Sequence, residues 1–298
     1  MQEYSFQIDP AGLRQGPVET NTRWANTSIN LEPCASGLQT TAPPLFIRGL
    51  PTEESHPFPQ MLEIGDHLWL LGESTFYLVR QDGFVERRIG GVSTCGHPWA
   101  VATFPSYAIA TNYQTVVRLK KEWVVPEEQG LANKNKRVPV SRALCAWNGQ
   151  LISFNVFAYG EHQPTRWQSS KVGTEDERVM AAGSGGGYVS WSGEGLAALP
   201  LRQGPVLYGD GGISLLTPAP PPFYFGERVL ADGVGIAGPL AVTGDMDRHI
   251  FIGRDGALYL LTAGGIKKLG YSDHLAVAAK ACPSMTMLAE SQKVYVRY

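Results

Sequence analysis

Residues 70–88 read LLGESTFYLVRQDGFVERR, and the same pattern returns at residues 251–269 as FIGRDGALYLLTAGGIKKL. Residues 207–217, LYGDGGISLLT, repeat its first half. In each copy an apolar strand ends at a glycine, a short turn follows, and a second apolar strand begins. Glycine supplies the positive φ angle that such turns need, and alternating apolar residues face a sheet core. The pattern therefore predicts antiparallel sheets built from repeated strand–turn–strand units.

The spacing of the turn glycines gives the size of the repeat. Gly72 and Gly209 are 137 positions apart (209 − 72), close to three intervals of about 45 residues, and Gly253 follows Gly209 by 44 positions (253 − 209). A repeat of about 45 residues is typical of a four-stranded propeller blade. We therefore predict an all-β fold, a β-propeller of about six four-stranded blades over residues 45–298, with an N-terminal extension over residues 1–44.

Other turn signals lie between these copies. Asn148-Gly149 is a strong hairpin signal. We also expect a hairpin in which Gly193–Gly195 joins strands at 188–192 and 196–199. The glycine-rich run Gly183–Gly187 is expected to be a turn, because neither a helix nor a Lys-Ser/Thr pair follows it, as a phosphate-binding loop would require.

The end of the chain predicts the last blade. Strands are expected at 275–278, 285–288 and 293–298, although residues 274–280 also have some helical character. An early segment, Thr22–Leu31 or Leu45–Arg48, would complete this last sheet and leave the ring without an open edge.

Composition excludes several classes of protein. The chain has 34 Gly and 21 Pro, and only 17% of its residues are charged, which argues against a coiled coil, a helix bundle or a disordered chain. A net charge of −2 argues against binding nucleic acid through phosphate neutralisation. We expect neither a secretory signal nor a membrane span. The four widely spaced cysteines are expected to be free thiols in a reducing compartment.

No motif predicts a catalytic, metal or cofactor site. Cys95-Gly96-His97 could place a nucleophile and a base on one strand face, but no other motif supports that pair. Asp245-Met246-Asp247 reads as turn carboxylates, because the further oxygens of a calcium loop are missing. The basic stretch Lys134–Arg142, with other basic residues nearby, is expected to be a solvated face. We therefore expect no enzyme activity, and no cofactor.

Two segments resemble a known class of protein. Residues 29–44, INLEPCASGLQTTAPP, resemble the first segment of tailed-bacteriophage tail and virion-stabilising proteins, with an Asn-Leu start, a central glycine and closing prolines. Residues 144–152, LCAWNGQLI, and 162–170, HQPTRWQSS, are similar to the central hairpin of those proteins, with Trp-Gln-Ser in place of the more usual Trp-Ser pair. The resemblance covers about a third of the chain.

The resemblance implies a structural virion protein of a tailed bacteriophage, a ring-forming tail nozzle, hub or adaptor near the DNA exit path, assembled in the host cytoplasm. Its expected partners are other tail or head-to-tail proteins and further copies of itself in a homo-oligomeric ring, with passive contact to passing DNA. A carbohydrate-binding or hydrolytic propeller is the alternative, and a scaffold that binds peptides at its top face is a third. The residues expected to contact partners are Trp24, Pro43, Lys134, Lys136, Arg137, Arg166, Trp167, Pro221 and Phe223.

Overall fold

The computed structural model describes residues 31–34, 37–40, 60–64, 67–80, 84–90, 96–120, 124–127, 138–173, 183–221, 223–270, 272–281, 283–288 and 293–297. The chain divides into two compact units, Met1–Ile47 and Arg48–Tyr298. In the first unit, β1 (Leu31–Cys34) and β2 (Gly37–Thr40) form an antiparallel hairpin. Leu31 pairs with Thr40 there, and the rest of the segments expected to close the ring lies outside the described residues.

The second unit holds five antiparallel four-stranded sheets, each made of four consecutive strands. We number these sheets as blades 1 to 5. Blade 1 is β3 (Gln60–Ile64), β4 (His67–Leu71), β5 (Phe76–Val79) and β6 (Val85–Ile89); blade 2 is β7 (Ala100–Phe104), β8 (Tyr107–Thr111), β9 (Val116–Lys120) and β10 (Val124–Glu127). Blade 3 is β11 (Ser141–Trp147), β12 (Gln150–Ala158), β13 (Glu161–Ser169) and β14 (Gly185–Tyr188). Blade 4 is β15 (Gly195–Leu201), β16 (Gly204–Gly209), β17 (Gly212–Pro218) and β18 (Phe225–Asp232); blade 5 is β19 (Val242–Gly244), β20 (Arg248–Ile252), β21 (Leu258–Thr262) and β22 (Gly265–Gly270).

The sixth sheet of this unit has two described strands, β23 (Ser284–Leu288) and β24 (Lys293–Arg297), and a helix, α1 (Ser272–Lys280), precedes it. The strand expected at 275–278 is therefore wrong. This segment is rich in alanine, which has the highest helix propensity, and α1 buries Ala278 completely. Gly256 lies against the helix, because a Cβ atom there would come within 2.8 Å of Ala276 Cα.

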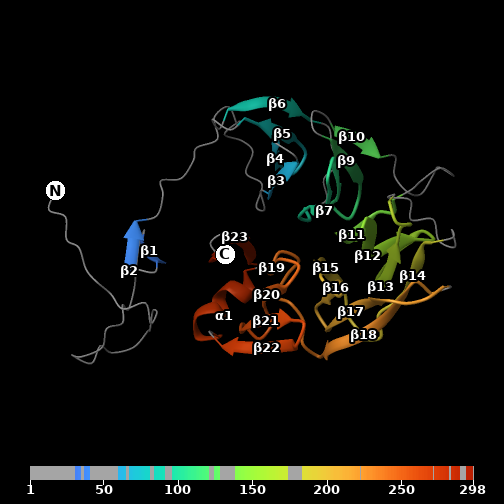
Figure 1. Ribbon diagram of the computed structural model, residues 1–298. Helices are drawn as coiled ribbons and strands as arrows, with labels where there is room; N and C mark the ends of the chain where they lie inside the picture. The colour runs from blue at the N-terminus through green and yellow to red at the C-terminus, as the bar shows by residue number, and fades with distance from the viewer. Residues whose placement is uncertain are drawn as a thin grey trace, which may run out of the picture. The chain divides into compact units, whose positions relative to one another are not determined.

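The blades follow one another in chain order, clockwise in Figure 1 from β3–β6 to β23. The first strand of each blade contacts the first strand of the next, from β7 through β11, β15 and β19 to β23. Hydrophobic clusters fill the spaces between neighbouring blades, so the core lies between sheets. Trp69, Trp147 and Trp191 belong to these clusters, as their strand-like surroundings predicted. The chain is thus an all-β propeller.

The repeat read from the sequence is confirmed. Gly72, Gly209 and Gly253 each lie where the second strand of a blade gives way to the third, in blades 1, 4 and 5. The wide interval from Gly72 to Gly209 covers blades 2 and 3, in which other residues form the turn between the second and third strands. Asn148-Gly149 joins β11 to β12, with φ angles of 46° and 73°, as a tight hairpin turn requires.

Two local predictions were wrong. The hairpin expected around Gly193–Gly195 is the connection between blades: β14 is the outer strand of blade 3 and β15 the inner strand of blade 4. The run expected to be a turn, Gly183–Gly187, enters β14 at Gly185. Glycine is needed here for close packing, because a Cβ atom on Gly187 would lie 3.1 Å from the Trp167 ring.

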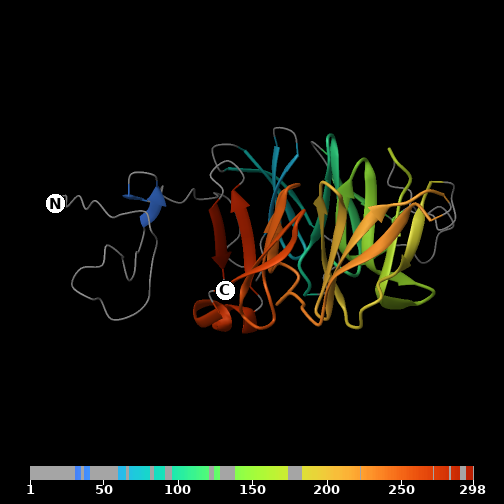
Figure 2. The same cartoon turned by 60° about the horizontal axis from the view of Figure 1, so that its bottom comes forward.

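Alternate turns place two sets of residues at opposite ends of the blades. One end holds the starts of the inner strands, the turns between second and third strands, and α1; we call it the start face (Figure 2, lower side). The other end, the opposite face, holds turns such as Asn148-Gly149. Side chains from several blades can therefore meet at the start face, where the inner strands come together.

Candidate functional site

A cavity of about 400 Å³ lies among the inner strands of the blades. Its walls come from β3, β7, β11, β15, β19 and β23, so it is the central cavity of the propeller. Most of the lining is apolar, including Val101, Leu199 and Met285. Arg142, the second residue of β11, lies at the end of this cavity that opens toward the start face.

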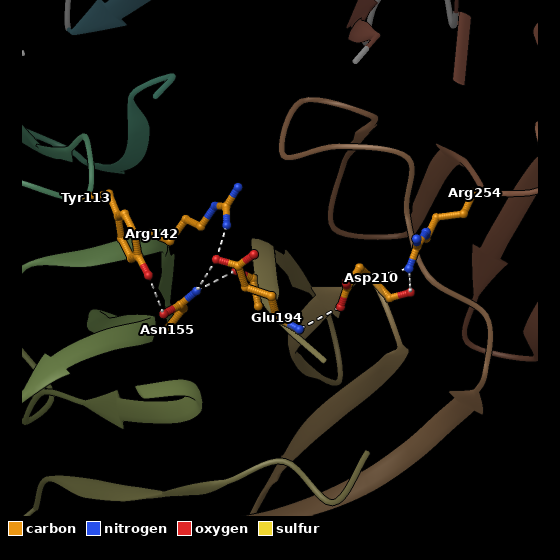
Figure 3. A network of polar contacts seen from close by, with 7 residues as sticks. Tyr113, Arg142, Asn155, Glu194, Asp210 and Arg254 are labelled. Atoms are coloured by element: carbon orange, nitrogen blue, oxygen red, sulfur yellow. Dashed lines mark hydrogen bonds and ion pairs between the residues drawn. The ribbon is translucent and has the colours of Figure 1, made fainter. Parts of the chain in front are cut away.

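Polar and aromatic side chains gather around Arg142, and we call this group the Arg142 cluster. It brings together residues from three successive blades, several of which appear in Figure 3. Its members are His97 before β7, Tyr113 in the β8–β9 turn, Arg142 in β11, Asn155 in β12, His162 in β13 and Glu194 before β15.

The centre of the cluster is an ion pair between Arg142 and Glu194, joined through Arg142 Nη1 and Glu194 Oε1. Asn155 Nδ2 donates to the Gly195 carbonyl at 3.0 Å and to Glu194 Oε1 at 3.4 Å. The Tyr113 hydroxyl donates to Asn155 Oδ1 at 3.3 Å. These bonds tie blade 2 to blade 3 and blade 3 to blade 4 at the mouth of the cavity (Figure 3).

Aromatic rings cover one side of the ion pair. The Tyr113 ring stacks on His162 with centroids 3.6 Å apart, and the His97 ring meets Tyr113 edge-on at 5.3 Å. The Arg142 guanidinium carbon lies 5.6 Å from the Tyr113 ring centroid, within the range of a cation–π contact. The Phe157 ring meets His162 in an edge-to-face arrangement, with centroids 4.7 Å apart.

The backbone at this cluster is unusual. Tyr113 and Asn155 have φ angles of 74° and 55°, in the left-handed region that side chains other than glycine rarely adopt. Asn155 lies at a bulge, where the pairing of β12 with β13 shifts register between Phe154 and Val156. A bulge redirects side chains, and strained residues of this kind concentrate at functional sites. Both distortions aim their side chains at the same ion pair.

The environment disfavours charge on the two histidines. Burial, followed by the nearby Arg142 charge, lowers the pKa of His97 below its ordinary value, while Glu194 acts in the opposite direction. Burial also lowers the pKa of His162, with His97 as the next cause. Burial and then Glu194 raise the pKa of the Tyr113 hydroxyl. At neutral pH these rings are therefore uncharged.

Two polar atoms of the cluster have no hydrogen-bond partner among the described residues. Arg142 Nε and His162 Nδ1 are both shielded from solvent and unpaired. Shielded polar atoms are almost always paired in folded proteins, so an unpaired donor on a charged guanidinium is a reason to look for a ligand.

The polar network continues toward blade 5. The Glu194 backbone N–H donates to Asp210 Oδ1 at 2.6 Å, and Arg254 Nη1 lies 3.6 Å from Asp210 Oδ2 (Figure 3). A second cavity, of about 390 Å³, lies beside Asp210 and Arg254. Asp255 and Tyr259 also line it. The start face thus carries a continuous series of polar groups from blade 2 to blade 5.

Among the described residues, no group of three or more His, Cys, Asp or Glu side chains is arranged to hold a metal ion. In the same part of the chain, no helix has the length and hydropathy of a membrane span. Asp245 behaves as the turn carboxylate predicted for the Asp245–Asp247 segment, because it accepts from the backbone N–H groups of Asp247 and Arg248 at 2.8 and 3.0 Å.

The structure describes four of the residues expected to contact partners. Arg166 is 7% exposed and lies over the rings of Tyr159 and Tyr188, at 5.2 and 6.0 Å from their centroids. Trp167 is 4% exposed and belongs to the core between blades 3 and 4. Pro221 and Phe223 lie in the β17–β18 connection at the opposite face, where Phe223 is 72% exposed. Trp24, Pro43, Lys134, Lys136 and Arg137 lie outside the described residues.

The structure does not bring these four residues together into one site, and none belongs to the Arg142 cluster. Sequence reasoning placed Arg142 in a solvated basic stretch, whereas its side chain is only 15% exposed and ion-paired. The partner, Glu194, is 52 positions further along the chain, so no local motif connects them. An alignment of the blade repeats could have placed Arg142 and Glu194 at equivalent positions, since both residues lie at the starts of inner strands.

No protein-family model matches the chain, and neither does any curated protein. Among solved structures, it is similar to Kluyveromyces lactis Hsv2, with a TM-score of 0.43 and 10% identity over 68% of this chain and 61% of that one. It is also similar to YCF48 bound to D1 peptide, with a TM-score of 0.47 and 13% identity over 89% of this chain and 82% of that one. The third is U3-55K, with a TM-score of 0.43 and 10% identity over 71% of this chain and 68% of that one. The chain spans about three fifths of the length of the Hsv2 structures that it matches.

These comparisons contradict the resemblance to phage tail proteins, because none of the three structures is a tail nozzle, hub or adaptor. The expected function as a phage virion protein and the expected virion localisation were therefore wrong. Part of the second motif has a simpler origin, because Asn148-Gly149 and the apolar strand after it are features of any tight β-hairpin. The conclusion that stands is the fold, an all-β propeller.

Proposed function

We propose that this chain is a non-enzymatic β-propeller that binds a segment of a partner protein at its start face, over the Arg142 cluster. One observation carries the proposal: side chains from three blades converge at the mouth of the central cavity while a guanidinium donor there remains unpaired. Propellers host many functions, so the fold alone does not assign one to this chain.

The cluster has the composition of a protein-binding surface. Tyrosine and arginine are enriched where interfaces concentrate their binding energy, because they combine a large apolar area with hydrogen-bond donors. Tyr113 and Arg142 lie beside each other here, with Glu194 41% exposed next to them. Their mutual bonds hold these side chains in place before binding, which reduces the entropy lost when a partner orders them.

The same bonds argue for binding over catalysis. A general acid or base must be able to exchange a proton with a substrate. The Glu194 carboxylate is instead bonded to Arg142 and Asn155. Burial lowers the pKa of both His97 and His162, so both imidazoles are neutral at neutral pH. The arrangement therefore offers recognition groups with fixed geometry.

Peptide display tests this proposal. Random peptides would be selected against the wild-type protein from two libraries, one displaying internal segments and one displaying free C-termini. The cluster variant carries Tyr113→Ala, Arg142→Gln and Glu194→Gln. The matched control carries Arg202→Gln and Asp247→Asn, which removes an exposed ion pair at the opposite face.

We expect selected peptides to bind the control variant as they bind the wild type and to lose binding to the cluster variant. Thermal unfolding would show that both variants are folded. Peptides that bind the cluster variant as tightly as the wild type would contradict the proposal, and so would the failure of both libraries to enrich any sequence.

A further inference from the structure

We propose that the central cavity binds the apolar C-terminal end of a partner polypeptide, with the terminal carboxylate on the Arg142 guanidinium. This inference rests on the function proposed above and specifies its ligand. It combines the chemistry of the cavity wall with the unpaired atoms at the cavity mouth.

The wall suits a ligand that combines apolar side chains with a polar backbone and one negative charge. Arg142 is the only charged residue among the described residues that line the cavity. The remaining lining is dominated by Ala, Val, Leu and Pro side chains together with Trp99 and Met285. A cavity of about 400 Å³ falls in the size range of small-ligand sites, ~300–1,000 Å³, which suits the last few residues of a peptide.

Arg142 has donors to spare. A guanidinium carries five N–H groups in a planar fork, and among the described residues the one hydrogen-bond partner of Arg142 is Glu194, at Nη1. Nε is shielded and unpaired, and Figure 3 shows part of the group turned away from Glu194. Nη2 is the donor that a ligand can reach, because it is not among the shielded atoms, and a carboxylate there would accept a charge-assisted hydrogen bond.

A second unpaired atom fits the same ligand. Gln60, the first residue of β3, lines the cavity, and its Oε1 is shielded without a hydrogen-bond partner. Since inner strands begin at the start face, Gln60 and Arg142 lie toward the same end of the cavity. A C-terminal residue presents a carboxylate acceptor and a backbone N–H donor close together. Arg142 would donate to the carboxylate, and rotation of the Gln60 side chain would let its Oε1 accept from the backbone N–H.

Charge explains why a carboxylate is preferred to a cation. Glu194 already neutralises part of the Arg142 charge, but it does so from outside the cavity lining. Among the described residues that line the cavity, the Arg142 guanidinium is the one charged group. A basic side chain entering there would meet a like charge in a poorly solvated space, which is costly.

The experiment uses two matched peptide pools. Each peptide carries an N-terminal fluorescein, a Gly-Ser spacer, and alanine, valine or leucine at each of the last three positions. One pool ends in a free carboxylate and the other in an amide, and binding is measured by fluorescence anisotropy. Hexanoate is added as a competitor, to distinguish a peptide terminus from a free short-chain acid.

We expect the free-acid pool to bind the wild-type protein at least tenfold more tightly than the amide pool. Arg142→Gln should lower affinity for the free-acid pool by roughly tenfold to a hundredfold, the usual range for loss of a charged hydrogen bond, and abolish the preference for it. Val101→Phe, which narrows the cavity and leaves Arg142 intact, should weaken both pools. The matched control Arg202→Gln, at the opposite face, should change neither.

If Arg142→Gln unfolds because Glu194 loses its partner, the double variant Arg142→Gln/Glu194→Gln removes both charges and gives the same readout. Equal affinity for the two pools, or an unchanged preference in a folded Arg142 variant, would overturn the inference. Displacement by hexanoate at the concentration of the peptides would overturn the assignment to a polypeptide. Enrichment of internal peptides that require the cluster, with no free-acid preference here, would refute this inference and leave the proposed function standing.

Discussion

His249 is completely buried between blades 4 and 5, and we predict that His249→Leu destabilises the propeller by about 3 kcal/mol. The histidine connects the two blades through both ring nitrogens. The Tyr208 hydroxyl lies 2.7 Å from Nδ1, and Nε2 lies 3.0 Å from the Pro200 carbonyl oxygen. Because the carbonyl can only accept, Nε2 carries the proton and Nδ1 accepts from Tyr208.

The magnitude follows from the groups left unpaired. Leucine removes both hydrogen bonds and leaves a buried hydroxyl and a partly buried carbonyl without these partners, at about 1–3 kcal/mol each. Tyr208→Phe removes one bond and leaves only Nδ1 unpaired, so its expected cost is about 1–2 kcal/mol. The double variant should cost less than the sum of the two single variants, because each already removes the shared bond.

Stability should also depend on pH through His249. Burial is the largest cause that lowers the pKa of His249 below 6.5, against smaller opposing effects from Pro200 and Asp245. The unfolded chain then binds a proton at a higher pH than the folded chain. The contribution of neutral His249 to the free energy of unfolding is therefore fully present above pH 6.5 and is lost as the pH falls below that value. The loss is at most about 1.4 kcal/mol at pH 5.5.

Urea unfolding followed by tryptophan fluorescence at pH 7.5 and 5.5 measures both effects. The wild type should lose stability between these pH values, and His249→Leu should lose less, since one proton-binding group is gone. A loss under about 0.5 kcal/mol for His249→Leu at pH 7.5 would refute this account of the blade contact. An unchanged pH dependence in the variant would refute the assignment of the proton to His249.

Further predictions concern packing, accessibility and assembly. Gly195→Ala should destabilise the protein by about 1–3 kcal/mol in urea unfolding, because a Cβ atom there would lie 2.5 Å from the Phe154 ring. Gly226→Ala is the control and should have little effect, because the nearest atom to its Cβ would be 3.7 Å away. Equal losses of stability in the two variants would contradict this difference in packing. Cys145 is 3% exposed, so iodoacetamide should modify it far more slowly in the native protein than in urea, as peptide mass spectrometry can measure, and rapid native labelling would contradict its burial. Phe223, one of the expected contact residues, is 72% exposed, and we predict that it packs between copies of the chain. Sedimentation velocity should give a multiple of the chain mass, and Phe223→Asp should shift it toward the monomer, whereas a wild-type monomer would refute the assembly.

Much of the fold could be predicted because it follows from local chemistry. Gly72, Gly209 and Gly253 mark equivalent turns, and tight turns restrict which residues can occupy them. The errors arose where long-range packing overrides local signals. Gly185 belongs to a strand because it pairs with Ser169 of β13, and nothing in the local sequence shows that neighbour.

The candidate site was harder to predict for a related reason. Arg142 and Glu194 are on different blades, and their pairing depends on how inner strands pack in the ring. Tyr113 and Asn155 both have positive φ angles, but neither is a glycine, so the sequence gives no sign of this backbone conformation. Local patterns therefore predicted the blades, whereas the side chains that meet between blades required the structure.

The most direct test of the central claim is to locate a bound peptide. A free-acid peptide from the pool described above, with benzoylphenylalanine near its C-terminus, would be photocrosslinked to the wild-type protein and the site mapped by mass spectrometry. We predict crosslinks to inner-strand residues that line the central cavity, such as Val101, Leu199 and Val242, and their loss in Arg142→Gln. Crosslinks that fall instead on outer strands, around Tyr159 and Tyr188, and persist in Arg142→Gln would contradict the claim.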